Sequence, residues 1–75
     1  MSLSDVMIHI EPALSADARS SLEERMRQID GVIAPRFNPG KEHLLLIAFD
    51  PDKTGPADLL GAVKSAGHAA QQVGV

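Results

Sequence analysis

Three histidines and a methionine are the side chains of this sequence best suited to binding a transition metal. Met7 and His9 alternate along one predicted strand, His43 begins another, and His68 follows a predicted helix. Imidazole and thioether groups are ligands for copper, nickel and zinc. If the strands carrying His9 and His43 are neighbours, Met7, His9 and His43 could form a weak site for one of these ions. Nothing in the spacing requires three ligands to converge, so we expect no cofactor.

His68 and Arg19 each have a functional interpretation and a simpler structural one. His68 ends the segment Ala66-Gly67-His68. A single imidazole does not make a metal site, so we favour a loop side chain that closes the end of the preceding helix. Arg19 lies near a predicted helix N-terminus, where it could help to hold an anion. Glu23 follows four residues later, and a surface ion pair between the two is the simpler expectation.

The composition excludes several other chemistries. The 75 residues contain no cysteine, which rules out disulfides, thiolate metal sites and cysteine nucleophiles. The acidic pairs Glu23-Glu24 and Asp50/Asp52 could suggest acid–base catalysis, but the sequence offers no nucleophile beside them. A chain this short also has little room for a substrate pocket, so we expect no enzymatic activity. The net charge is −3, and Phe37 and Phe49 are the two aromatic residues. We therefore expect no nucleic-acid partner.

The N-terminal segment MSLSDVMIHIEP carries no targeting or membrane signal. It has no basic stretch, and its apolar run is interrupted by Asp5, His9 and Glu11. It is typical of neither a signal peptide nor a membrane span. We expect a cytoplasmic protein with no membrane span.

Hydrophobic periodicity divides the chain into four strands and two helices. Apolar residues alternate at period two before Pro12 and recur at helical spacing after Ser15, which can cap that helix. Pro35 places its strand at a sheet edge or a bulge, and Pro56 suits the first position of the second helix. The predicted elements are a strand over 5–11, a helix over 16–30, a strand over 32–37, a turn over 38–42, a strand over 43–49, a helix from 56 to Gly67, and a final strand within 68–75.

The order of these elements predicts the fold. A β-α-β-β-α-β sequence without a linker or low-complexity tract forms a split βαβ unit. We therefore expect one domain over residues 1–75, of the α+β class. The expected architecture is a ferredoxin-like βαββαβ sandwich, with a four-stranded antiparallel sheet and both helices on one of its faces.

Two segments resemble a known family. Gly31-Val32 follows the first helix, and AFDPDKTGPADLLGAVKSAGHAA occupies residues 48–70. With these segments and its element lengths, roughly residues 5–73 resemble the heavy-metal-associated domains, found as small copper chaperones and at the N-termini of metal-pumping P-type ATPases. The resemblance implies the ferredoxin-like fold, a role in metal transport, and a metal loop after the first strand.

That loop lacks the ligands that the resemblance implies. Family members that carry metal have Cys-x-x-Cys there. In this chain the loop reads PALSADARSS at residues 12–21, and the resemblance puts Ala16, which follows Ser15, and Arg19 at the two cysteine positions. Alanine has no donor atom, and arginine stays protonated. We expect a degenerate metal loop formed by Ser15, Ala16 and Arg19.

The strongest predicted strand is apolar on both of its faces. If Leu45, Ile47 and Phe49 face the helices, Leu44 and Leu46 lie on the opposite face together with Met7. The uncovered face of an antiparallel sheet is normally polar. Met7, Leu44 and Leu46 could therefore form an interaction surface for a homodimer or a protein partner. The alternative is that a short central strand is simply hydrophobic throughout.

These expectations favour a non-catalytic protein-interaction or regulatory module that resembles heavy-metal-associated domains but lacks thiolate ligands. The alternative is a metal-binding or transport protein. It would use a site without cysteine, formed by His68 with His9, His43 or a methionine, or it would share a metal with a partner that supplies thiolates. A small ligand-binding or enzymatic ferredoxin-like domain is a third, less favoured class.

Overall fold

A computed structural model describes residues 3–11 and 13–73 of the chain. Pro12, predicted to end the first strand, lies outside the described residues, as do Gly74 and Val75 of the predicted last strand. The elements are β1 (Ser4–Glu11), α1 (Ala16–Arg27), β2 (Val32–Asn38), β3 (Lys41–Phe49), α2 (Pro56–Ser65) and β4 (Ala69–Val73).

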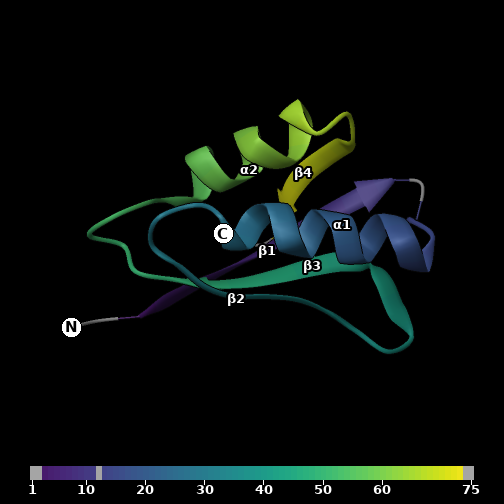
Figure 1. The fold of residues 1–75 in the computed structure, drawn as a ribbon, viewed down its shortest axis with the longest axis horizontal. Coiled ribbons are helices and arrows are strands. Elements are labelled where there is room, and N and C mark those ends of the chain that lie inside the picture. The colour runs from purple at the N-terminus through teal and green to yellow at the C-terminus, as the bar shows by residue number, and fades with distance from the viewer. Residues whose placement is uncertain (1–2, 12, 74–75) are drawn as a thin grey trace.

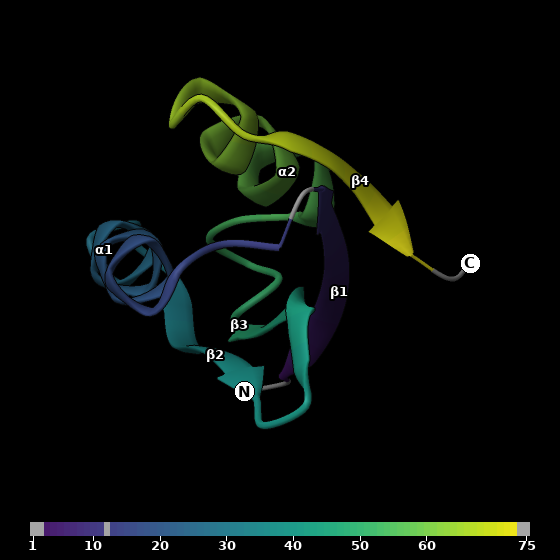
Figure 2. The same cartoon turned by 90° about the vertical axis from the view of Figure 1, so that its right-hand side faces the viewer.

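The four strands form one antiparallel sheet in the order β2-β3-β1-β4. Figures 1 and 2 show α1 and α2 on the same side of this sheet, with the other side uncovered. Each helix connects two strands that do not pair with each other, as the split βαβ topology requires. The predicted ferredoxin-like α+β fold is confirmed.

The core lies between the sheet and the helices. Every second residue of β1 and β3 is buried there, and each helix contributes two fully buried side chains. Burying a side chain of this size stabilises the fold by roughly 1.5–3 kcal/mol, so this alternation fixes which face of the sheet meets the helices. The buried hydrophobic residues are Val6, Ile8, Ile10, Leu22, Met26, Leu45, Ile47, Phe49, Leu59 and Val63.

Helix α1 ends at Arg27, three residues before the predicted end. The N–H of Gln28 donates to the carbonyl of Arg25 and the N–H of Ile29 to that of Met26, and the chain then turns through Gly31, whose φ is 101°. A β-carbon at Gly31 would lie 2.8 Å from the Cβ of Lys53. The helix ends early because the chain must pass this close to the β3–α2 loop before it enters β2.

Strand β2 lies at one edge of the sheet, where Pro35 is expected. Its register against β3 shifts between Val32 and Ala34, so Ile33 lies in a bulge. The turn into β3 has a φ of 80° at Gly40, as a type II corner with Pro39 in its second position requires.

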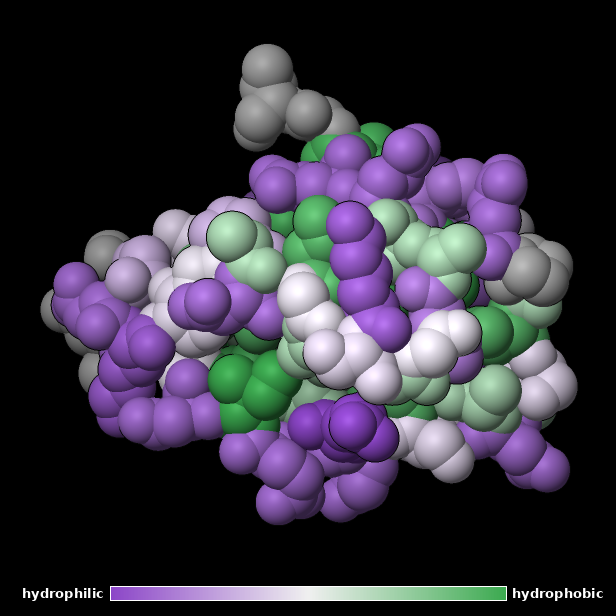
Figure 3. All heavy atoms as spheres, turned by 90° about the horizontal axis from the view of Figure 1, so that it is seen from above, coloured by the Kyte–Doolittle hydropathy of each residue, from purple (hydrophilic) through white to green (hydrophobic). Residues whose placement is uncertain are grey.

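On the side of α2 the surface mixes hydrophilic and pale residues, and its green, hydrophobic areas are small and separate (Figure 3).

Candidate functional site

The loop that enters α1 is held together by its own polar groups. Ser15 is the N-cap residue, with an extended backbone. Its hydroxyl oxygen accepts a hydrogen bond of 3.2 Å from the N–H of Ala18, and its carbonyl accepts one of 2.9 Å from the N–H of Arg19. The first bond satisfies one of the donors that every helix N-terminus leaves free, and the second is the first regular backbone bond of the helix.

The side chain of Arg19, in the first turns of α1, reaches back to bond with the same loop. Its Nη1 donates to the carbonyl oxygen of Leu14 at 2.7 Å, and the side chain is half-buried. Arg19 stands at a cysteine position of the resemblance, and Ala16, at the other, has no donor atom. Within the described residues, the loop thus contains a cation bonded to a backbone carbonyl and no group suited to a soft metal.

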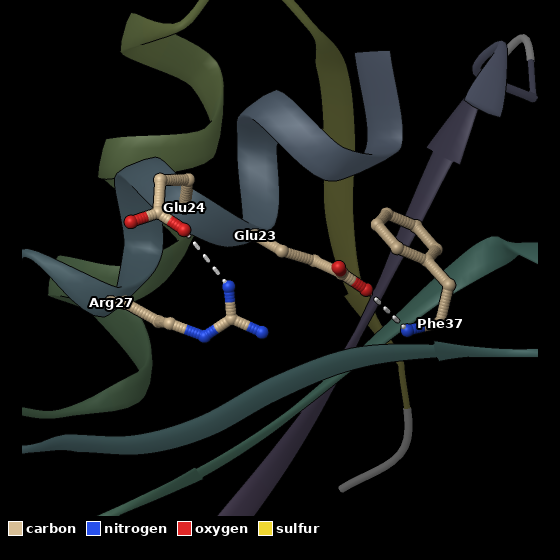
Figure 4. Close-up of polar contacts among 4 residues, drawn as sticks. All are labelled: Glu23, Glu24, Arg27 and Phe37. Atoms are coloured by element: carbon tan, nitrogen blue, oxygen red, sulfur yellow. Dashed lines mark hydrogen bonds and ion pairs between the residues drawn. The ribbon is translucent and has the colours of Figure 1, made fainter. Parts of the chain in front are cut away.

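The predicted ion pair between Arg19 and Glu23 is wrong. A carboxylate oxygen of Glu23 accepts a hydrogen bond of 3.1 Å from the N–H of Phe37, on the edge strand β2 (Figure 4). Glu24 pairs with Arg27 at 3.1 Å, and both side chains are largely exposed. Sequence spacing favoured the local partner, whereas the observed bond joins residues fourteen positions apart.

The structure brings two of the three histidines together. The rings of His9 and His43 lie edge to face, with centroids 5.3 Å apart and planes at 82°. Nε2 of His9 lies 3.6 Å from a carboxylate oxygen of Glu11. His43 lies where the register of β2 against β3 shifts, between Phe37 and Asn38, so the regular alternation of faces is interrupted there. His9, Glu11 and His43 line one hollow with Ala13 and Ala69.

His68 lies apart from this pair. It lines a separate hollow of about 260 Å³ against α1, with Ala18, Ser21, Leu22, Arg25 and Ala66. This placement fits the loop side chain that closes the end of α2. Over residues 3–11 and 13–73, no group of three or more histidine, aspartate or glutamate side chains is arranged to hold a metal ion.

The face of the sheet without helices carries the expected apolar side chains. Met7 pairs in register with Leu46, and His9 with Leu44. Met7 is 36% exposed, and both leucines are half-buried. We call this side of the sheet the open face and define it by Met7, His9, Leu44 and Leu46.

Sequence reasoning missed one apolar residue of this face. Val73 pairs in register with Met7 and is 39% exposed, so an apolar row crosses three strands from Leu46 through Met7 to Val73. The length and register of the last strand could not be read from AAQQV alone. No helix in the part of the chain that the structure describes is long and apolar enough to cross a membrane.

The fold closely matches solved metal-binding domains. The N-terminal domain of a potential copper-translocating P-type ATPase from Bacillus subtilis, solved in its Cu(I)-loaded state, superposes with a TM-score of 0.84 at 22% identity, over 97% of this chain and 90% of that one. Oxidized MerP from Ralstonia metallidurans CH34 gives 0.84 at 15% identity, over 97% and 100%. The CopZ metallochaperone gives 0.77 at 20% identity, over 93% and 100%.

These similarities concern the fold alone, because every identity is low. No protein-family model matches the sequence, and no curated protein matches it either. Two of the superpositions cover 97% of this chain. This chain therefore has the ferredoxin-like fold of copper-binding and metallochaperone domains and contains no cysteine.

Proposed function

We propose that this chain is a non-catalytic protein-interaction module that keeps the fold of metal-binding domains without their metal loop. The observation that carries the proposal is the loop entering α1, where the Ser15 hydroxyl caps the first turn of the helix and the Arg19 side chain bonds to the carbonyl of Leu14. A loop that carries metal presents free ligands, and thiolates are the ligands that copper(I) prefers. In a regulatory role, the domain would bind to a transport protein as a docking module.

The open face is the contact surface of this proposal. Its row of Leu46, Met7 and Val73 leaves two side chains more than a third exposed on a chain of only 75 residues. The solvent side of an antiparallel sheet is usually polar, so such a row is expected where another protein covers it. The occupant would be a protein partner or a second copy, and a cytoplasmic location remains a prediction.

A second function is supported by one observation, the edge-to-face contact of His9 and His43. Two imidazoles at this separation could rotate to share a copper, nickel or zinc ion, with Glu11, Met7 or a partner's thiolate as a further ligand. His68 would not take part, since it lies against α1. A site of this kind would bind the metal ion weakly, because His9 and His43 alone would supply most of its ligands.

Thermal unfolding separates the two functions. Chelator-treated protein is heated alone and with Cu(I), Cu(II), Ni(II) or Zn(II), because a ligand that prefers the folded state raises Tm. The double variant Ala16→Cys/Arg19→Cys is the positive control, and it should gain a Cu(I)-dependent rise. The interaction proposal expects no rise in the original chain. A rise that His9→Ala abolishes and His68→Ala does not would instead establish the histidine site.

Light scattering after size exclusion tests the interaction itself. The expected result is concentration-dependent association of the metal-free protein, indifferent to chelator and weakened by Leu46→Lys. Ile33→Lys is the matched control, since Ile33 is 55% exposed in the β2 bulge. A monomer at every concentration, with Leu46→Lys changing neither stability nor any association, would overturn the proposal.

A further inference from the structure

The two edges of the sheet are protected to very different degrees. An unpaired strand edge offers free N–H and C=O groups to any other strand, so proteins usually block it. Edge strand β2 is interrupted by Pro35 and by the bulge at Ile33, and the carboxylate of Glu23 accepts the N–H of Phe37 (Figure 4). Three separate devices thus prevent a further strand from adding to β2.

Edge strand β4 has none of these devices. Within the described residues it pairs with β1 alone, on one side, and lies at the end of the sheet (Figure 2). Its sequence, Ala-Ala-Gln-Gln-Val, contains no proline and no charge, and its register against β1 is regular throughout. Four of its five side chains are exposed.

We propose that β4 pairs antiparallel with β4 of a second copy, about a two-fold axis at Gln71, so that two sheets join into one of eight strands. The inference rests on the proposed interaction function and adds a contact with a second copy at the sheet edge beside the open face. Pairing two five-residue strands adds about four to six backbone hydrogen bonds, depending on which residues point outward. Such a contact is small, so we expect a weak, reversible dimer.

The side chains of β4 complement themselves about this axis. Gln71 would face Gln71 of the second copy, and an amide can donate to and accept from an identical amide. Val73, on the same side of the sheet as Gln71, would lie opposite Ala69 of the second copy. Ala69 and Gln71 border a hollow of about 250 Å³ that also contains His9 and Glu11. The exposed isopropyl group of Val73 would therefore meet a small residue beside open space.

The neutral side chains of β4 remove one obstacle to its pairing with a second copy. The chain carries a net charge of −3, so two copies repel each other at most surfaces. Like charges directly opposite each other destabilise a strand pair. The neutral β4 avoids that repulsion along the strand pair itself.

Sedimentation equilibrium of the chelator-treated protein, from about 10 µM to about 1 mM, tests this pairing over the range expected for a small interface. The original chain should dimerise reversibly. Gln71→Lys should weaken dimerisation about tenfold or more, and so should Gln71→Glu, because each places like charges across the axis. Gln28→Lys makes the same substitution at an exposed position after α1 and should leave dimerisation unchanged.

A mixture of the two charged variants gives the decisive result. Lysine and glutamate would then face each other across the axis, so the mixture should recover association that neither variant shows alone. Circular dichroism would establish that both variants fold. A chain that stays monomeric to about 1 mM, or a mixture that does not recover, overturns the β4 pairing. Dimers that resist both Gln71 variants but are lost in Leu46→Lys also overturn it, while leaving the proposed function of the open face standing.

Discussion

The two strand-to-helix loops occupy equivalent places in the two halves of the fold, yet they are held in different ways. The loop from β1 to α1 is bonded by Ser15 and Arg19 and is largely exposed. The loop from β3 to α2 begins at Asp50, which is only 8% exposed, and includes Thr54 at 9%. The second loop thus buries its first residue and Thr54, although the residues between them are exposed, and we call it the buried loop.

The hydrogen bonds of the second loop explain the difference. A carboxylate oxygen of Asp50 accepts the N–H of Asp52 at 2.9 Å, and its carbonyl accepts the N–H groups of Lys53 and Thr54. The N–H of Asp50 donates to the carbonyl of Gly31 at 2.7 Å. This loop therefore ties the end of β3 to the start of β2, whereas the described residues of the loop entering α1, 13–15, bond only to the helix that they precede.

The two loops should therefore contribute differently to the stability of the fold. Changes in the buried loop must disturb the contacts between the two halves. Changes in the exposed loop need not disturb the core. Substitutions in the two loops should therefore differ in their cost to the free energy of unfolding.

The largest expected loss is at Gly31, where the buried loop meets β2. Gly31→Ala places a side chain at a φ of 101°, with its β-carbon 2.8 Å from Cβ of Lys53. The left-handed backbone costs about 1–2 kcal/mol and the close contact adds to it, so we expect a loss of about 2–4 kcal/mol. Urea unfolding followed by circular dichroism measures it.

Gly61→Ala is the matched control for Gly31→Ala. Gly61 lies within α2, and a β-carbon there meets nothing within 4 Å. Alanine should stabilise this helix by about 0.5–1 kcal/mol. If both substitutions had the same sign and size, the close approach of Gly31 to the buried loop would not contribute to stability.

A smaller loss is expected at Asp50. Asp50→Ala removes the oxygen that accepts the N–H of Asp52, in a region where water cannot fully replace it. We expect a loss of about 1–2 kcal/mol in the free energy of unfolding. Asp52→Ala is the control, because the Asp52 side chain is exposed and should contribute less than about 0.5 kcal/mol. Equal losses in the two variants would contradict the asymmetry within this loop.

The fold was predictable from the sequence because its signals are local. Alternation in β1 and β3 identified the buried face, Pro35 identified an edge strand, and Pro56 identified the start of α2. The early end of α1 was not predictable, because it depends on the approach of Gly31 to Lys53 across 22 positions of the chain. Residues that meet only after folding leave no periodic pattern in the sequence.

The candidate site was predictable only in part. The absence of cysteine and the apolar open face follow directly from the residue types and the strand period. The bond from Arg19 to the carbonyl of Leu14 and the bond from Glu23 to Phe37 were not foreseen, since spacing favours an ion pair between Arg19 and Glu23. The position of Val73 on the open face could be known only from the register of β4 against β1, which the composition of β4 does not specify.

The smallest expected loss concerns the exposed loop. Arg19→Met keeps most of the side-chain length but removes the donor to the carbonyl of Leu14, and it should cost about 0.5–1 kcal/mol because the group is only half-buried. Arg27→Met is the control, as the exposed pair of Arg27 with Glu24 contributes roughly 0–0.5 kcal/mol. Urea unfolding compares the two.

Hydrogen exchange at Ala18 and Arg19 would then show where the loss occurs. If the loop is separable from the core, Arg19→Met should speed exchange at these two amides and leave the amides of β1 and β3 protected. Faster exchange throughout the sheet would mean that Arg19 supports the whole fold. In that case substitutions in the loop entering α1 would destabilise the core, and the contrast between the two loops would fail.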